Sequence, residues 1–245
     1  MMISTQNNFS IHRADSRGQA DHGWLQARFS FSFASFYDPE RIQFGMIRVM
    51  NDDRIAGGKG FGMHPHDNME IITIPLSGAL AHQDNMGNEG IIKAGDVQVM
   101  SAGTGVMHSE FNPQAEEETR LFQIWIFPNQ LNVSPRYEQL SFAPELRKNQ
   151  FQYLVAPHHR EEGGLWIHQN AYISRIDMER EFQASYQVHG AHQGVYLMNI
   201  EGAVEVNGNH LAKRDALAIQ SIEHFEIKAQ EASQLLLIET PLSHH

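Results

Sequence analysis

Short apolar or alternating segments recur along the whole chain, and turns rich in Gly, Asn, Asp and Pro separate them. Segments of roughly four to eight residues with this punctuation are typical of β-strands, because amphipathic helices need longer runs with a period near 3.6. The pattern therefore predicts an all-β sandwich or barrel. In the first half of the chain, the strand-like ranges are 29–33, 45–49, 70–76, 90–93, 96–100 and 121–127.

The second half of the chain repeats this pattern. Asn207-Gly208 predicts a hairpin turn, and the stretch 214–219 matches the stretch 95–100 in character. This weak internal duplication predicts two stacked barrels. The strand-like ranges of the second half are 151–155, 165–169, 171–176, 194–200, 203–206, 216–219, 225–227 and 235–239.

The boundary between the two barrels is expected near residues 135–150. Turn-forming residues follow Asn132, and residues 143–148 have the composition of a short helical turn. Residues 1–140 are therefore assigned to an N-terminal barrel and residues 141–245 to a C-terminal barrel.

Length and charge narrow the classes of function. A chain of 245 residues suits one large β domain or two of about 120 residues each. The formal net charge of -11 argues against direct binding to nucleic acid or to anionic membranes, because phosphates repel an acidic surface. The absence of cysteine excludes disulfides, thiolate ligands and a cysteine nucleophile. Residues 1–10 do not resemble a signal peptide and no apolar run reaches about 18 residues, so a cytoplasmic protein is expected.

Two pairs of side chains that can bind a metal each have the spacing i, i+2. His64 and His66 form the first pair, and His108 and Glu110 form the second. Because residues i and i+2 of a strand face the same side, each pair can aim at one point. Two such pairs that meet inside a barrel would surround one ion with three imidazoles and one carboxylate. A six-coordinate divalent ion would then keep two positions open for water or another ligand.

Glycines frame both pairs and make the pattern specific. The first motif reads G-x5-H-x-H-x3-E-x7-G from Gly58 to Gly78, and the second runs from Gly95 to Asn112. Together they resemble the two cupin motifs. Further segments in unbroken order between about residues 25 and 140 resemble the pirin family of bicupins, and these segments are 29–33, 37–39, 44–51, 60–66, 69–71, 76–82, 95–98, 101–110, 123–125 and 135–137.

The resemblance implies an all-β bicupin, which is a pair of stacked cupin (jelly-roll) barrels. It also implies that His64, His66, His108 and Glu110 bind one divalent metal in the N-terminal barrel. The metal is usually iron in pirins, although this ligand set would also accept Zn, Ni, Co, Mn or Cu. The C-terminal barrel is expected to be metal-free, because it lacks a second set of such pairs.

Some pirins are flavonol 2,4-dioxygenases (quercetinases), which open a flavonol ring with O2 and release carbon monoxide. The first hypothesis is therefore a metal-dependent dioxygenase for a flavonol-like aromatic substrate, with Glu110 as the catalytic general base. The competing hypothesis is a non-enzymatic metal-sensing regulator that binds a transcription factor or a metabolic enzyme. A third is a structural bicupin with an incidental metal. A monomer is favoured, because two fused barrels bury each other's faces.

Several other side chains have weaker claims on the site. Glu70 fills the place of the carboxylate ligand in other cupins, but Glu110 is better aimed. His82 is expected at the surface or behind the ligands. Five apolar residues are expected in the barrel core more often than in a pocket wall, and these are Phe44, Met46, Phe61, Met63 and Met107.

Overall fold

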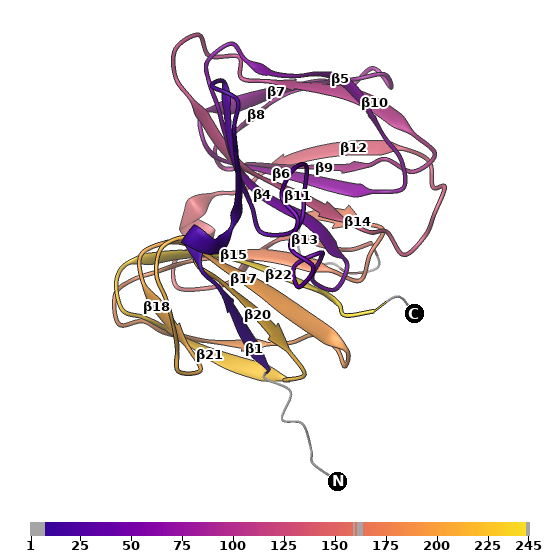
Figure 1. The fold of residues 1–245 in the computed structure, drawn as a ribbon. Helices are drawn as coiled ribbons and strands as arrows, with labels where there is room; N and C mark the ends of the chain where they lie inside the picture. Colours follow the sequence, from indigo (N-terminus) through magenta and orange to yellow (C-terminus); the bar gives the residue numbers. More distant parts are fainter. Residues whose placement is uncertain (1–7, 159, 161–163, 244–245) are drawn as a thin grey trace.

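The computed structural model describes residues 8–158, 160 and 164–243, which form two β-barrels packed against each other (Figure 1). Each barrel pairs a seven-stranded sheet with a four-stranded sheet. The helices among the described residues are two 3-10 turns, η1 (Ala14–Ser16) and η2 (Pro144–Arg147). None of the described helices is long and apolar enough to cross a membrane. The prediction of an all-β protein with two barrels is confirmed.

The first barrel contains eleven strands in two sheets. Its seven-stranded sheet has the order β12 (Arg136–Ser141), β9 (Asp96–Ser101), β6 (Glu70–Ser77), β11 (Thr119–Ile126), β4 (Ile47–Ile55), β3 (Leu25–Phe29) and β2 (Gly18–Asp21). Its four-stranded sheet has the order β5 (Gly60–His66), β10 (Val106–Phe111), β7 (Ala79–Asp84) and β8 (Glu89–Lys93).

The second barrel also has one seven-stranded and one four-stranded sheet. Its seven-stranded sheet has the order β1 (Phe9–His12), β20 (Ala216–Gln220), β17 (Gln193–Glu201), β22 (Ser233–Pro241), β15 (Tyr172–Met178), β13 (Gln152–Pro157) and β14 (Leu165–Ile167). Its four-stranded sheet has the order β16 (Gln183–Gln187), β21 (His224–Ala229), β18 (Val204–Val206) and β19 (Asn209–Leu211).

The two seven-stranded sheets lie face to face in the middle of the molecule (Figure 1). Side chains from both sheets form one apolar cluster, and burial of each such side chain contributes about 1.5–3 kcal/mol. Central strands such as β6 and β11 are buried on both faces, because the other barrel covers one face and the interior of their own barrel lies on the other. The cluster includes Ile72, Ile74, Phe122 and Ile124 from the first barrel and Leu154, Tyr196, Met198 and Ile238 from the second.

Strand β1 departs from the predicted division of the chain at residue 140. It pairs with β20, with Phe9 opposite Ile219 and His12 opposite Ala216, and so joins the sheet of the second barrel. In Figure 1 this indigo strand lies among the orange and yellow strands. Without it, β20 would be an edge strand with unpaired backbone groups. Strand β12 pairs with β9 and stays with the first barrel.

Two of the predicted strands, 29–33 and 45–49, differ most from the observed ones. The range 29–33 was expected to be extended, but β3 ends at Phe29, and β4 begins at Ile47 and continues to Ile55. Between them, Ala34 and Gly45 adopt left-handed backbone conformations, with φ of 51° and 52°, so the chain turns there. The short helical turn expected at 143–148 is confirmed by η2.

Candidate metal centre

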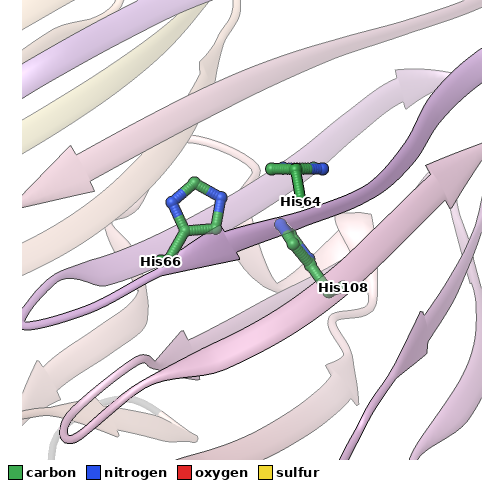
Figure 2. Close-up of side chains that lie close together, drawn as sticks. All are labelled: His64, His66 and His108. Carbon is green, nitrogen blue, oxygen red and sulfur yellow. The ribbon is translucent and has the colours of Figure 1, made fainter.

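Two neighbouring strands of the first barrel bring three histidines together. His64 and His66 lie on β5, and His108 lies on β10 directly opposite His64. The ring centroids of His64 and His108 are 4.4 Å apart, and those of His66 and His108 are 4.9 Å apart. One ligand atom from each of the three residues lies within 4.8 Å of the other two. Figure 2 shows the three rings gathered beside the two strands.

One of the glycines before His64 has a local structural reason. A Cβ added at Gly60 would lie 2.1 Å from the carbonyl oxygen of Glu110. Only glycine therefore lets the start of β5 approach β10 this closely. The close approach holds the two strands together beside the histidines.

Hydrogen bonds set the tautomers of two of these rings. His64 Nδ1 lies 2.8 Å from the carbonyl oxygen of Gly62, which only accepts, so Nδ1 carries the proton. His108 Nδ1 lies 3.5 Å from Nδ1 of His82, whose Nε2 lies 3.4 Å from Asp84 Oδ2. If Asp84 accepts from His82, then His82 Nδ1 accepts from His108 Nδ1. Both arrangements leave the Nε2 lone pair of the ring free.

Burial keeps the imidazoles of His66 and His108 neutral and ready to bind a metal. Burial, with a smaller effect of His64, lowers the pKa of His66 to about 4. Burial, with smaller effects of the neighbouring histidines, lowers the pKa of His108 to about 3. His108 Nε2 is buried and has no hydrogen-bond partner among the described residues. Because metal binding requires neutral imidazoles with free lone pairs, the three side chains fit a divalent ion.

Glu110 lies close to this group, but a β-bulge changes its position. The register shifts between His108 and Glu110, so Glu110 lies opposite Phe61 on β5. Its carboxylate belongs to a second group of potential ligand atoms within 4.8 Å of one another, together with His82 and His108. His108 therefore belongs to both groups, whereas the Glu110 carboxylate is not in the group that contains His64 and His66.

Side chains on the opposite sheet orient the Glu110 carboxylate. Gln123 Nε2 donates to both carboxylate oxygens, at 3.2 Å and 3.0 Å, and Thr73 Oγ1 lies 3.4 Å from Oε1. Burial raises the pKa of Glu110, and the hydrogen bond from Gln123 opposes that rise. A nearby cation would stabilise the ionised form of this buried carboxylate.

One largely apolar pocket of about 200 Å³ opens beside the histidines, and Phe33, Phe61 and Ile71 form part of its wall. A buried polar atom without a partner costs about 1–3 kcal/mol, so a group of them indicates a ligand site. Burial, with the charges of Asp52 and Glu110, raises the pKa of Asp53 in this pocket to about 8. The buried polar atoms of the lining that have no partner among the described residues are Asn51 Oδ1, Asp53 Oδ1, His108 Nε2 and Trp125 Nε1.

Comparison with known proteins identifies the family. The family model described as Pirin matches residues 10–126, and the model described as Quercetinase C-terminal cupin domain matches residues 154–240. A quercetin 2,3-dioxygenase of Escherichia coli is 41% identical over 231 residues, which are 94% of this chain and 98% of the relative. The chain belongs to the pirin family.

Other pirin relatives and solved structures agree with this assignment. A putative quercetin 2,3-dioxygenase of Pseudomonas aeruginosa is 44% identical over 225 residues, 92% of this chain and 96% of the relative. The crystal structure of YhhW from E. coli superposes with a TM-score of 0.91 at 40% identity, covering 97% of this chain and 99% of that one. A structure of the same bacterial pirin in complex with nickel(II) superposes with a TM-score of 0.89 at 40% identity, covering 95% and 99% of the two chains.

Several residues that the sequence offered as weaker candidates for the site lie away from the pocket. Glu70 is buried outside both groups of potential ligands, where Ser101 Oγ donates to its Oε2 at 2.7 Å.

Of the five apolar candidates, Phe61 lines the pocket, whereas Phe44 and Met46 belong to the cluster between the barrels. The expectation of a buried core position is wrong for Met63 and Met107, which are 49% and 41% exposed. Their side chains point out of the barrel because β5 and β10 alternate and the histidines face inward.

His82 is not a surface residue. It is only 2% exposed, its ring stacks on Tyr137 with centroids 4.5 Å apart, and it contacts His108 from behind. The sequence left both positions open, because alternation along a strand does not say which face an adjacent sheet covers. The structure therefore selects the position behind the ligands.

Sequence reasoning missed the polar residues that cross the interior of the first barrel. Asn51 pairs with Gln123, Gln123 with Thr73, and Thr73 with Gln98, so these four form one row across β4, β11, β6 and β9. Gln123, Thr73 and Gln98 each have an apolar neighbour on both sides in the sequence, whereas Asn51 begins the polar run 51–54. A single polar residue inside an apolar run, repeated in three strands, is the sequence signal that could have located most of the row.

The second barrel of the pirin holds a different buried polar group. Glu239 accepts hydrogen bonds from Tyr186 Oη at 2.9 Å and from the backbone N–H of His189 at 2.8 Å. His189 Nδ1 lies 2.8 Å from the same carboxylate, and its ring stacks on Tyr172. Among the described residues, both groups of three potential metal ligands lie in the first barrel.

Proposed function

We propose that this pirin is a metal-dependent dioxygenase of quercetin 2,3-dioxygenase type, which uses O2 to open the ring of a flavonol. The relatives that carry this name are similar over more than nine-tenths of the chain. The observation that carries the proposal is the pocket itself. Three imidazoles converge on one side of it, and its lining includes polar atoms of Asn51, Asp53 and Trp125 that have no partner in the described part of the chain.

In this proposal, His64, His66, His108 and Glu110 hold one divalent metal, with Fe(II) as the physiological ion. A nickel complex of the similar E. coli pirin supports a divalent ion in this family. Imidazole and carboxylate together suit Fe(II), Ni(II) and related ions, so the choice in the cell depends on supply as well as affinity. Such an ion supplies acidification of a bound hydroxyl and one-electron chemistry with O2.

Glu110 is the proposed general base for the 3-hydroxyl of the flavonol. Gln123 Nε2 donates to both oxygens, and Thr73 Oγ1 contacts only Oε1. Oε2 therefore has fewer protein donors and is the oxygen that receives the proton. Gln123 keeps the carboxylate plane fixed while the proton transfers, which preserves the reactive geometry.

The pocket walls orient the substrate. Trp125 Nε1 donates to a carbonyl oxygen of the flavonol, and the oxygens of Asn51 and Asp53 bind its phenolic hydroxyls. Phe33 and Phe61 pack against the aromatic rings and exclude water. A volume of about 200 Å³ is smaller than the usual range of about 300–1,000 Å³ for drug-sized ligands. One part of the flavonol therefore remains at the pocket mouth.

The test is oxygen uptake and carbon monoxide release after quercetin is added to protein loaded anaerobically with Fe(II). We expect uptake in the parent, none in His66→Ala, and an unchanged rate in His189→Ala, a matched control in the second barrel. Trp125→Phe should raise KM by about tenfold, because one hydrogen bond to the substrate is lost. No uptake with any flavonol by protein that binds the metal tightly would reject the enzyme and favour the metal-sensing regulator.

Two further properties remain predictions. A cytoplasmic location is proposed from the sequence, and fractionation of the source cells with marker enzymes would test it. A monomer is proposed because each barrel already covers the other's seven-stranded sheet. Light scattering on the metal-loaded protein would test this, and a mass of twice 27.8 kDa would contradict it.

A further inference from the structure

A groove at the junction of the two barrels gathers positive charge in a protein whose formal net charge is -11. Its volume is about 520 Å³, and its lining has two acidic residues, Asp21 and Asp52. Six of the 18 lysines and arginines of the chain line it, and these are Arg17, Arg28, Arg54, Arg120, Lys213 and Arg214. A third of all cationic side chains therefore faces one groove.

The first barrel supplies most of this lining from one face of its seven-stranded sheet. Side chains alternate along β4, so Asp52 and Arg54 line the groove, while Asn51 and Asp53 line the metal pocket on the other face. Arg54 lies directly opposite Arg120 on β11. Like charges in directly opposed positions destabilise a sheet, and an anion between them would remove that repulsion.

The acidic residues of the groove compensate only part of this charge. Asp52 Oδ2 lies 3.4 Å from Arg17 Nη1 and 3.5 Å from Arg214 Nε, so two guanidinium groups share one carboxylate. The side chain of Arg54 has no hydrogen bond or ion pair among the described residues. Arg28 Nη1 donates to a neutral glutamine at 2.6 Å. Arg120 pairs with Glu118 and Lys213 with Glu201, whereas Arg28 and Arg54 lack an acidic partner among the described residues.

Arg214, which also lines the groove, has an unsatisfied hydrogen-bond donor and an unusual backbone conformation. Its Nη1 atom is buried and has no hydrogen-bond partner within the described part of the chain. Burial lowers the pKa of Arg214, and the charges of Arg17 and Arg54 add to this effect against Asp52 and Glu201. Its φ of 65° is left-handed, which strains a residue with a side chain. Such strain and unsatisfied donors occur where a ligand completes the contacts.

We propose that this groove binds a small phosphate ester that carries two phosphate groups, such as a sugar bisphosphate. Guanidinium groups bind phosphate oxygens in pairs, and the bound anion would turn the repulsion between Arg54 and Arg120 into attraction to a shared partner. The groove volume lies within the usual range of small-molecule sites. The groove does not favour a nucleic acid, because the phosphates beyond the groove would lie over the rest of an acidic protein, which repels them. The site is separate from the metal pocket and does not depend on the dioxygenase activity.

The first experiment is isothermal titration calorimetry of the metal-loaded protein with fructose 1,6-bisphosphate at low ionic strength. Inorganic phosphate and a short DNA duplex serve as comparison ligands. We expect saturable binding of one bisphosphate per chain, weaker binding of inorganic phosphate, and a loss of affinity as salt is added. No saturable heat from the bisphosphate, or saturable binding of the duplex alone, would overturn the proposal.

Paired variants then locate the site. Arg54→Gln combined with Arg120→Gln should weaken bisphosphate binding at least about tenfold, because two charge-assisted contacts are lost. The matched control is Lys148→Gln combined with Arg180→Gln, which removes the same charge from side chains that are 63% and 76% exposed outside the groove. The groove variant should unfold at the same temperature as the parent or higher, since a repulsive pair is removed. Equal weakening in both paired variants would show non-specific attraction and reject the site.

Discussion

The two barrels share one strand arrangement but fill their interiors differently. In the second barrel, one continuous cluster of buried apolar side chains occupies the interior, and it includes Phe225, Ile227 and Leu237. In the first barrel, the apolar side chains form two separate clusters, which contain Leu80 and Met100. Histidines and the row of polar residues occupy the rest. The same fold therefore serves packing in one barrel and leaves room for a ligand in the other.

Buried carboxyl groups show the same contrast. Glu239 in the second barrel is fully buried, and Tyr186 and His189 satisfy it with three close contacts. Asp53 in the first barrel is 5% exposed, and its Oδ1 has no partner among the described residues. Polar groups without partners reduce stability, and proteins retain them where function requires them.

The largest expected effect tests the second barrel as a packing unit. Phe225 is fully buried and stacks on Tyr186, with ring centroids 5.3 Å apart. Phe225→Ala should lower the free energy of unfolding by about 3–5 kcal/mol, because it leaves a cavity in a continuous core. Urea unfolding measures the loss, and metal titration under native conditions should show unchanged affinity. A parallel loss of metal affinity would mean that the barrels are not functionally separate.

A pH experiment tests the cost of a buried acid in the first barrel. Burial raises the pKa of Glu70 from 4.5 to about 7, against the hydrogen bond from Ser101. Between these values the unfolded chain loses a proton that the folded chain keeps, so stability falls as pH rises through this window and then stays constant. The loss is about 3 kcal/mol. Urea unfolding from about pH 4 to about pH 8 should show a fall in stability that is about 3 kcal/mol larger in the parent than in Glu70→Gln, because other buried groups with a shifted pKa, such as Asp53, contribute equally in both proteins. Parallel pH profiles for the two proteins would contradict it.

A variant of His82, which lies behind His108, tests how the first barrel positions its candidate metal site. His82→Phe keeps an aromatic ring against Tyr137 but removes the acceptor for His108 Nδ1. Metal affinity should fall about 10- to 100-fold, as for other partners of ligating histidines. A competition titration with a chelator measures this. His82→Asn retains an acceptor and should recover part of the affinity, whereas Tyr186→Phe in the second barrel should have no effect. Unchanged affinity in His82→Phe would remove His82 from the site.

The smallest expected effect concerns the polar row. Both side-chain polar atoms of Gln98 are buried and have no partner among the described residues. Gln98→Met keeps the shape and removes this cost, so it should stabilise the protein by about 1–2 kcal/mol. Urea unfolding at neutral pH gives the value, with Leu237→Met in the second barrel as a packing control. A destabilised Gln98→Met protein would mean that the row is already satisfied in solution, for example by bound water.

Local physics explains what could be predicted from the sequence. The i, i+2 spacing of His64 and His66 places both on one face of any strand, and turn residues such as Asn207 and Gly208 end strands wherever they occur. These are properties of a few consecutive residues, so the all-β class and the orientation of His64 and His66 to one face followed from the local pattern. The two barrels followed from the internal duplication, and the meeting of both histidines with His108 was implied by the resemblance to the pirin family.

Only the tertiary structure decided the properties that depend on distant strands. Ile71-Ile72-Thr73-Ile74 reads as one apolar run, because its strand is covered on both faces, so periodicity could not tell that Thr73 faces the site and Ile72 the other barrel. The bulge in β10, the addition of β1 to the second barrel and the opposition of Arg54 and Arg120 depend on register. Register is set by contacts between segments far apart in the chain, and the order of residues within one strand does not specify it.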